Sequence, residues 1–486
     1  MNRRLPPAGG SGDDGAERGA AAGGHRAGDG GPHGPAEAGQ DEGPNPAPAA
    51  APGVRKNEDS TAGPTSTPAA VYRYLLLRTV GTLATETLQF AVPVLVYQST
   101  GNLAWSGLAL ALEWLPRLVS LPLAGPLVDY FGVHRVYIVS DVVRGTAAVC
   151  VALTIALAGS TVVGAVVLFA LVAGACFQQT FVANEKAVRV LVSGSAVPRA
   201  QSWLGAVDQT TLLAGPAVGA GLLTLGGGMA VFIAASALYA ISLALVLLEH
   251  HLSDGTGTVA RGGRETVVHE EGAAGGRPRW AAVLRTIRRR LAAGARRVRG
   301  DPVLRDVVLI AMVVNLMLGM VISCAPALVT HVYHRSGSQL GLAYTCAGAA
   351  SLLVLLGTPW LARRHGLLTV GVGSTALACL AFAGLGAAPG FLAFGALLAL
   401  FLCGDSALTV FVRTVRARVV PPHEYGSTVG VIVLLNFLPM PLAGALVAAS
   451  RWILPLPALL AAVGGCCLAA TILLGRRMAR HRGAPW

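Results

Sequence analysis

A few charged side chains interrupt stretches of sequence that are otherwise apolar. An unpaired charge in the interior of a membrane costs at least about 2.5–3.5 kcal/mol, so such residues normally serve a function. A carboxylate in this setting can bind and release a proton. Glu86 is the best candidate, because no basic residue lies within four positions of it in the sequence. A proton carrier, a static hydrogen bond and a misplaced helix boundary all stay open for this residue.

Other polar side chains in the apolar stretches are further candidates for proton coupling or for lining a cavity. Glu113 and Arg117 are four residues apart on one helix face and could neutralise each other. Hydrogen bonding between helices is the commoner use of the amides. The remaining candidates are Gln89, Asp208, Asn315 and Asp405.

The composition requires these residues to lie in a membrane protein. The chain has 486 residues, of which 53% are hydrophobic and 13% charged, and its mean hydropathy is +0.61. A helix crosses a bilayer with about 20 apolar residues. Twelve apolar windows of that size follow one another, and we predict spans at 72–97, 105–127, 136–158, 161–184, 203–225, 229–249, 306–331, 338–361, 367–386, 390–412, 427–449 and 454–475.

Basic residues fall mainly in alternate loops, which predicts the orientation of the spans. One side carries Arg135, Lys186, Arg189, Arg199, Arg363, Arg364, Arg413, Arg416 and Arg418, whereas the opposite loops carry little more than Arg335 and Arg451. We therefore expect a multi-pass protein of the cell membrane with both termini in the cytoplasm. The abundance of arginine, alanine and glycine suggests a bacterial source. The net charge of +13 follows from this topology and does not call for a nucleic-acid partner.

The spans divide into two sets of six. We predict a disordered cytoplasmic tail (1–70), an N-terminal six-helix half (71–249), a cytoplasmic linker (250–305), a C-terminal six-helix half (306–478) and a short basic tail (479–486). Within the linker, apolar residues recur at helical spacing among arginines, which predicts an amphipathic helix in the headgroup layer. Its apolar positions are Trp280, Leu284, Ile287, Leu291 and Val298.

The two halves repeat a short loop. "GPLVDYFGVHR" (125–135) joins the second span to the third, and "PWLARRHGLLT" (359–369) joins the eighth to the ninth. Small Gly125 and Gly132 permit a tight turn and close helix approach. Asp129 could accept hydrogen bonds from neighbouring arginines or from a helix N-terminus of the other half. Such a contact would be a latch that forms in only one of two conformations of the protein.

Asp141 and Arg144, one turn apart at the start of the third span, could join this network or pair with each other. An ordinary solvated turn is the alternative interpretation of the loop. Two repeated halves are typical of transporters that rock about a central site.

These residues resemble the loop motif of the major facilitator superfamily. Gly125, Leu127, Asp129 and Gly132 match its core and Arg135 supplies one base, whereas Tyr130 and Val133 stand where the family usually has basic residues. The flanking "WLPRLVSLPLAG" and "VSDVVRGTAA" look most like the branch of siderophore exporters and drug or macrolide efflux pumps. The resemblance implies an all-α membrane protein of twelve transmembrane helices in two pseudo-symmetric halves.

A second motif lies in the fifth span. "AGPAVGAG" is similar to the antiporter motif of the same family, which is associated with exchange of substrate for protons. It contains Gly215, Pro216, Gly219 and Gly221. Plain helix packing is the alternative, because glycine and proline are common in membrane helices.

The expected function is proton-coupled efflux of a drug-like, siderophore or secondary-metabolite compound by alternating access. No GxxxxGK[ST] phosphate loop is present, so we expect no ATP hydrolysis by this chain. We expect no enzyme activity, cofactor or metal, and a monomer whose partners are a small-molecule substrate, protons and the lipid bilayer. An importer or lipid flippase is the main alternative; a sensor or a membrane-embedded enzyme is remote.

Overall fold

The computed structural model describes residues 68–191, 197–248, 280–421 and 425–481. Residues 1–67 of the predicted N-terminal tail and the segment 249–279 lie outside the described residues, and residues 68–70 of that tail begin the first helix. All regular elements in the described part are helices. Helix formation over these long apolar stretches follows from the membrane, because a spanning segment must pair its backbone groups within itself.

Five helices make up the described part of the N-terminal half. They are α1 (Pro68–Thr100), α2 (Leu103–Phe131), α3 (Val133–Ala158), α4 (Val163–Leu191) and α5 (Val197–Leu248). α5 is interrupted at Gly226 and Gly227, whose backbone angles are not helical. The two sides of this break correspond to the predicted fifth and sixth spans.

The linker helix and the C-terminal half follow. They are α7 (Trp280–Gly300), α8 (Pro302–Ala327), α9 (Gly337–His365), α10 (Leu367–Gly384), α11 (Phe391–Val419), α12 (Tyr425–Phe437), α13 (Pro439–Ile453) and α14 (Leu456–Ala479). A short π-helical turn, Leu328–Val332, extends α8. α12 and α13 meet at Leu438 and together form the predicted eleventh span.

The number of spans agrees with the sequence. In the described chain, 11 helical segments are long and apolar enough to cross a membrane. One of them, Ala206–Leu248, has 43 residues and contains the glycine break. Counting its two parts separately gives twelve, so the predicted fold class is confirmed.

The repeat of the two halves is visible in the backbone. Gly132, between α2 and α3, has φ 81° and ψ 159°, and Gly366, between α9 and α10, has φ 86° and ψ 143°. Both values of φ lie in a region that side chains with a Cβ rarely adopt. A single glycine therefore makes the same sharp turn at the equivalent place in each half.

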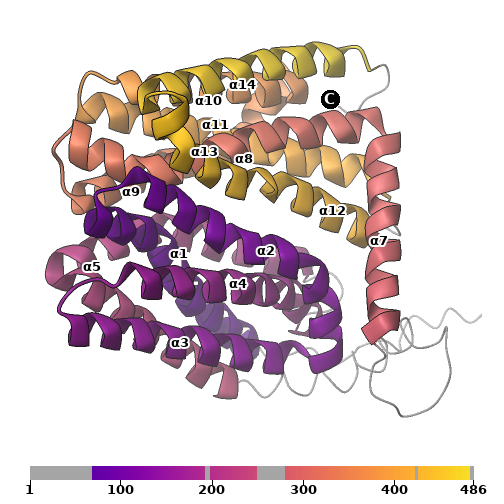
Figure 1. Ribbon diagram of the computed structural model, residues 1–486. Coiled ribbons are helices and arrows are strands. Elements are labelled where there is room, and N and C mark those ends of the chain that lie inside the picture. Colours follow the sequence, from indigo (N-terminus) through magenta and orange to yellow (C-terminus); the bar gives the residue numbers. More distant parts are fainter. Residues whose placement is uncertain (1–67, 192–196, 249–279, 422–424, 482–486) are drawn as a thin grey trace, which may run out of the picture. The chain divides into compact units, whose positions relative to one another are not determined.

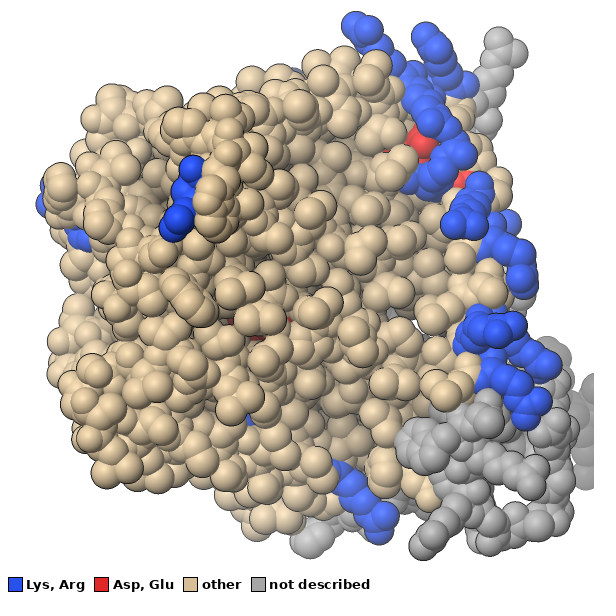
Figure 2. Space-filling view, viewed as in Figure 1, with Lys and Arg blue, Asp and Glu red and all other residues tan. Residues whose placement is uncertain are grey.

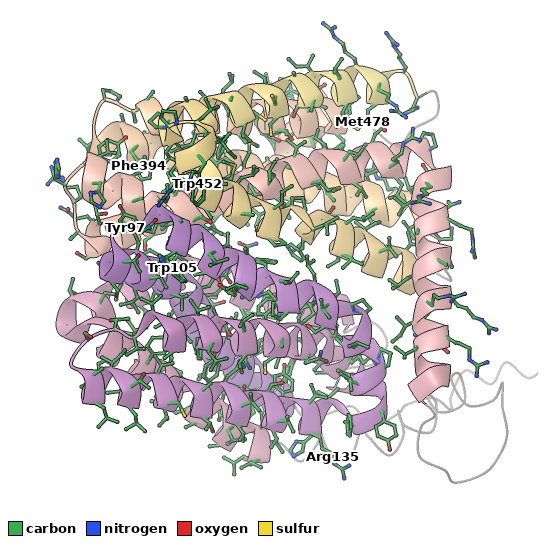
Figure 3. All side chains as sticks on the ribbon, in the orientation of Figure 1. Tyr97, Trp105, Arg135, Phe394, Trp452 and Met478 are labelled. Carbon is green, nitrogen blue, oxygen red and sulfur yellow. The ribbon has the colours of Figure 1, made fainter. Side chains whose placement is uncertain are left out.

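The halves pack together at the end of the molecule opposite α7, which we call the closed end. Here α2 contacts α13, and α5 contacts α9. Gly107 of α2 lies against Gly444 and Ala448 of α13, and Ser106 Oγ donates a hydrogen bond to the carbonyl of Ser323 at 2.9 Å. Figure 3 places Tyr97, Trp105 and Trp452 towards this end and Met478 and Arg135 towards the other. Figure 1 shows α7 along that other end, beside the starts of α8 and α12.

The predicted linker helix exists, but part of its apolar face is covered by protein. Val298 is buried, and Leu291 and Ala295 pack with it against residues of α8 and α12. Leu284, nearer the start of α7, is exposed. Figure 2 shows lysine and arginine side chains gathered along the edge of the molecule where α7 and the end of α14 lie.

Candidate functional site

A cavity of about 370 Å³ lies between the two halves. It is lined by α1, α2 and α5 from one half and by α8, α9, α11 and the α12–α13 junction from the other. Its volume falls within the range of about 300–1,000 Å³ that is usual for small-molecule sites. Its walls are mainly apolar, and the polar lining side chains include Glu86, Gln89, Gln209, Tyr344, Ser351, Asp405 and Ser406.

Two aromatic pairs in the cavity wall bridge the halves. Phe90 of α1 meets Tyr344 of α9 edge to face, with ring centroids 6.0 Å apart. Trp114 of α2 and Phe437 of α12 have centroids 5.0 Å apart. Trp114 is buried, and its indole N–H has no hydrogen-bond partner among the described residues. The indole ring contributes aromatic surface to the cavity wall, whereas its N–H is itself buried.

Glu86 and Asp405 both line this cavity, one from each half. Every other acidic side chain that the structure describes has an ion-pair partner: Glu113, Asp141, Asp208, Asp301 and Asp306. Neither Glu86 nor Asp405 has a hydrogen-bond or ion-pair partner within the described part of the chain. The predicted candidates therefore separate into paired carboxylates and two that face the cavity.

Asp208 is paired with an arginine that the sequence analysis did not single out. Arg78 of α1 donates to both oxygens of Asp208 in α5, with Nη2 at 2.6 and 2.7 Å and Nε at 3.1 Å. The Arg78 side chain is buried, whereas 43% of the Asp208 side chain is exposed. The sequence did contain a signal for this pair. Arg78 and Asp208 lie at similar depths near the inner ends of the first and fifth predicted spans. The pairing makes Asp208 a poor proton carrier.

Glu113 and Arg117 form the ion pair that their spacing predicts, and both side chains are buried. The guanidinium of Arg117 also lies over the rings of Trp114 and Phe177, 4.5 and 4.3 Å from their centroids. Such contacts stabilise a buried cation beyond its ion pair. Neither Glu113 nor Arg117 lines the central cavity.

Asp141 and Arg144 pair with each other and connect three helices of the N-terminal half. Arg144 Nη2 lies 2.6 Å from Asp141 Oδ1, and Arg144 Nη1 donates to Thr85 of α1 at 3.2 Å. The hydroxyl of Ser242 in α5 donates to Asp141 Oδ2 at 2.6 Å. A second cavity, of about 210 Å³, lies beside this network and shares Glu86, Gln209 and Leu212 with the central one. The pair is thus part of the interior of this half.

The loop motif is described only in part. Gly132 makes the turn discussed above, Leu127 is partly buried and Arg135 is exposed. The carbonyl of Gly125 accepts a hydrogen bond from Lys186 at 3.2 Å. The predicted close helix approach at Gly125 is wrong, because a Cβ there would meet nothing within 4 Å. The side chain of Asp129 lies outside what the structure describes, so the latch stays a prediction.

The glycines of the α5 motif differ in their surroundings. A Cβ on Gly215 would come within 2.8 Å of the backbone of Glu86, and one on Gly219 within 2.9 Å of Phe90. These two glycines therefore let α5 lie close against α1 at the carboxylate. Pro216 lines the central cavity and contacts Gly341 of α9. Gly221 takes no part in this packing, since a Cβ there would meet nothing within 4 Å.

Of the two amides among the candidates, only one reaches the cavity. Gln89 lines it. Asn315 of α8 does not; its amide donates to the carbonyl of Ala311 one turn earlier, at 2.9 Å. The expectation that Asn315 lines the cavity is wrong, because the side chain bonds its own helix.

Twelve apolar spans in two repeated halves, with a ligand-sized cavity between them, define a helical membrane transporter. The profile of the Major Facilitator Superfamily matches residues 74–444, and the chain belongs to this superfamily. It is a family of transporters and not of enzymes.

Solved structures of other transporters share the fold. The nucleoside transporter NupG superposes with a TM-score of 0.63 at 13% identity, covering 85% of this chain and 100% of that one. A bacterial homologue of the iron transporter ferroportin gives 0.58 at 15% identity in its inward-facing state and 0.54 at 17% in its outward-facing state. These cover 85% of this chain and 99% and 98% of the homologue chains. At such identities the likeness shows the fold alone. No curated protein matched the sequence.

Proposed function

We propose that this transporter exports a bulky, partly apolar compound in exchange for protons, and that Glu86 carries the proton. The observation that carries this proposal is the unpaired Glu86 in a cavity that both halves line. A carboxylate without a basic partner can take up a proton and become neutral in an apolar site, whereas the paired ones would leave a buried arginine uncompensated. The tight packing of Gly215 against Glu86 links the α5 motif to the same residue.

Alternating access would switch the side from which this cavity is reached. In the conformation described here the halves are closed at the end opposite α7. If α7 and both termini are cytoplasmic, the closed end is the outer one, as in an inward-facing conformation, in which an exporter takes up its cargo. The branch of siderophore and drug exporters, suggested by the loop and its flanks, supports the same direction.

Transport into proteoliposomes tests the coupling, because the sign of the pH gradient separates the mechanisms. An antiporter accumulates its substrate when the lumen is the more acidic side, whichever way the protein is inserted. A symporter, such as a proton-driven importer, accumulates it when the outside is the more acidic side. A panel of antibiotics, siderophores and secondary metabolites should be screened, with protein-free liposomes and a protonophore as controls. Accumulation that survives the protonophore would contradict the proposal.

The proposed topology has its own test. In a background without the eight native cysteines, Arg288→Cys in α7 and Arg335→Cys before α9 place single thiols at exposed positions on opposite ends. An impermeant thiol reagent is expected to label position 335 in intact cells and position 288 only after lysis. This follows from the excess of arginine at the α7 end. Labelling of position 288 from outside would show that the orientation is the reverse of the proposed one.

For the latch, we expect Asp129→Asn to lower transport several-fold while the amount of protein in the membrane stays at the wild-type level. The substitution keeps the shape of the side chain and removes only its charge. Transport is measured in proteoliposomes and the protein by quantitative blotting. Asp301→Asn is the matched control, because asparagine also caps helices well and Asp301 caps α8 at the same end. If Asp129→Asn transports at the wild-type rate, the loop is an ordinary turn and not a latch.

A further inference from the structure

The charge around the central cavity indicates which kind of compound it takes. No lysine, arginine or histidine is among the described residues that line it, whereas two carboxylates are. Each nearby buried arginine has an acidic partner of its own, so these pairs add no net charge: Arg117 is paired with Glu113, Arg78 with Asp208 and Arg144 with Asp141. When Glu86 and Asp405 are ionised, the cavity therefore carries negative charge.

The walls of the cavity suit a large apolar body. Phe90, Trp114, Tyr344 and Phe437 present aromatic surface from both halves. Aromatic faces attract cations, most strongly where water is excluded. The cavity thus combines negative charge with aromatic surface, which together favour a positively charged ligand with a large apolar body.

We propose that the central cavity binds amphipathic organic cations, with the positive centre held by Asp405 of α11 and the apolar body held by the aromatic wall. This rests on the proposed transport function, since it assigns the ligand of the same cavity. Asp405 is the anchor because Glu86 must exchange its proton during the cycle. The two carboxylates lie in different halves, so proton and cation are held on separate groups. A proton arriving on Glu86 removes one of the two charges that attract the cation, which favours its release.

The test uses two ions of nearly the same size and shape but opposite charge, tetraphenylphosphonium and tetraphenylborate. Binding to the purified full-length protein in detergent is measured by equilibrium dialysis, without any gradient. Saturable binding of the phosphonium is expected, with little or none of the borate. Asp405→Asn should weaken phosphonium binding about tenfold or more, because only the charge is lost.

Two further variants separate charge from folding. Asp405→Glu should retain phosphonium binding within a few-fold, and Asp301→Asn, which removes a carboxylate outside the cavity, should leave it unchanged. Equal binding of both ions, or unchanged phosphonium binding by Asp405→Asn, would overturn the proposal. Because binding needs no proton gradient, binding that depends on Asp405 without proton-driven accumulation would refute the proposed coupling and leave the cation site standing.

Discussion

Replacing both Gly107 and Gly444 by alanine is expected to drive the transporter out of the conformation described here. A Cβ on Gly107 would lie 2.7 Å from the backbone nitrogen of Ala448, and one on Gly444 would lie 2.8 Å from that of Ala111. Real Cβ atoms do not approach so closely, and backbone atoms of packed helices cannot move away cheaply. Overpacking of this kind costs about 1–3 kcal/mol at a site. The population closed at this end should therefore fall about five- to 150-fold for each substitution.

Spin labels at the closed end measure this shift. Spin labels are attached to cysteines that replace Ser99 of α1 and His334 before α9, both of which are exposed. Double electron–electron resonance then measures the distance between the halves. The double alanine variant should lengthen this distance and slow transport, because the cycle must pass through the closed state. Gly395→Ala in α11 is the control, since a Cβ there meets nothing within 4 Å. An unchanged distance distribution would show that the closed end does not depend on glycine contact.

The second large effect is expected from Glu86→Gln. Glutamine has the shape of protonated glutamate, so the variant should still bind substrate, although less tightly, and exchange it across the membrane without a gradient. It should not accumulate substrate when the lumen is acidified. A wild-type protein that exchanges one proton for each substrate molecule can reach about tenfold accumulation per pH unit, because one unit is about 1.4 kcal/mol. The variant should stay at equal concentrations inside and outside.

Counterflow of labelled substrate in the absence of a gradient is the internal control for this variant. Saturable counterflow with no accumulation assigns the proton to Glu86. Normal accumulation by Glu86→Gln would make the assignment wrong. Asp405 would then be the next carboxylate to test, because Glu113 and Asp208 are both held in ion pairs.

The spans could be predicted from the sequence because the bilayer imposes one length and one polarity on every helix. The glycine break in α5 also fell at the predicted boundary between two spans, since Gly226 and Gly227 lie between two complete apolar windows. The surroundings of α7 could not be predicted. Its periodicity indicates an apolar face, but the pattern does not say whether lipid or the side chains of α8 and α12 will cover it.

In the candidate site, contacts between residues close in sequence could be predicted, whereas contacts between distant residues could not. Glu113 and Arg117 are one helical turn apart, so their pairing follows from helix geometry alone. Arg78 and Asp208 are 130 residues apart, and only the packing of α1 on α5 brings them together. For the same reason the sequence could nominate Glu86 and Asp405 singly but could not show that they line one cavity. Asn315 failed as a cavity residue because its amide is satisfied by its own helix.

The position of the ion pairs has a consequence for the effect of ionic strength. Arg78–Asp208, Glu113–Arg117 and Asp141–Arg144 lie within the N-terminal half, and Asp306–Arg477 lies within the C-terminal half. The contacts described at the closed end are uncharged: glycine against backbone, and a serine hydroxyl on a carbonyl. Salt screens charges but hardly affects such contacts. Salt should therefore leave separation of the halves at the closed end nearly unaffected, so that sensitivity of the cycle to ionic strength reports on charged contacts elsewhere.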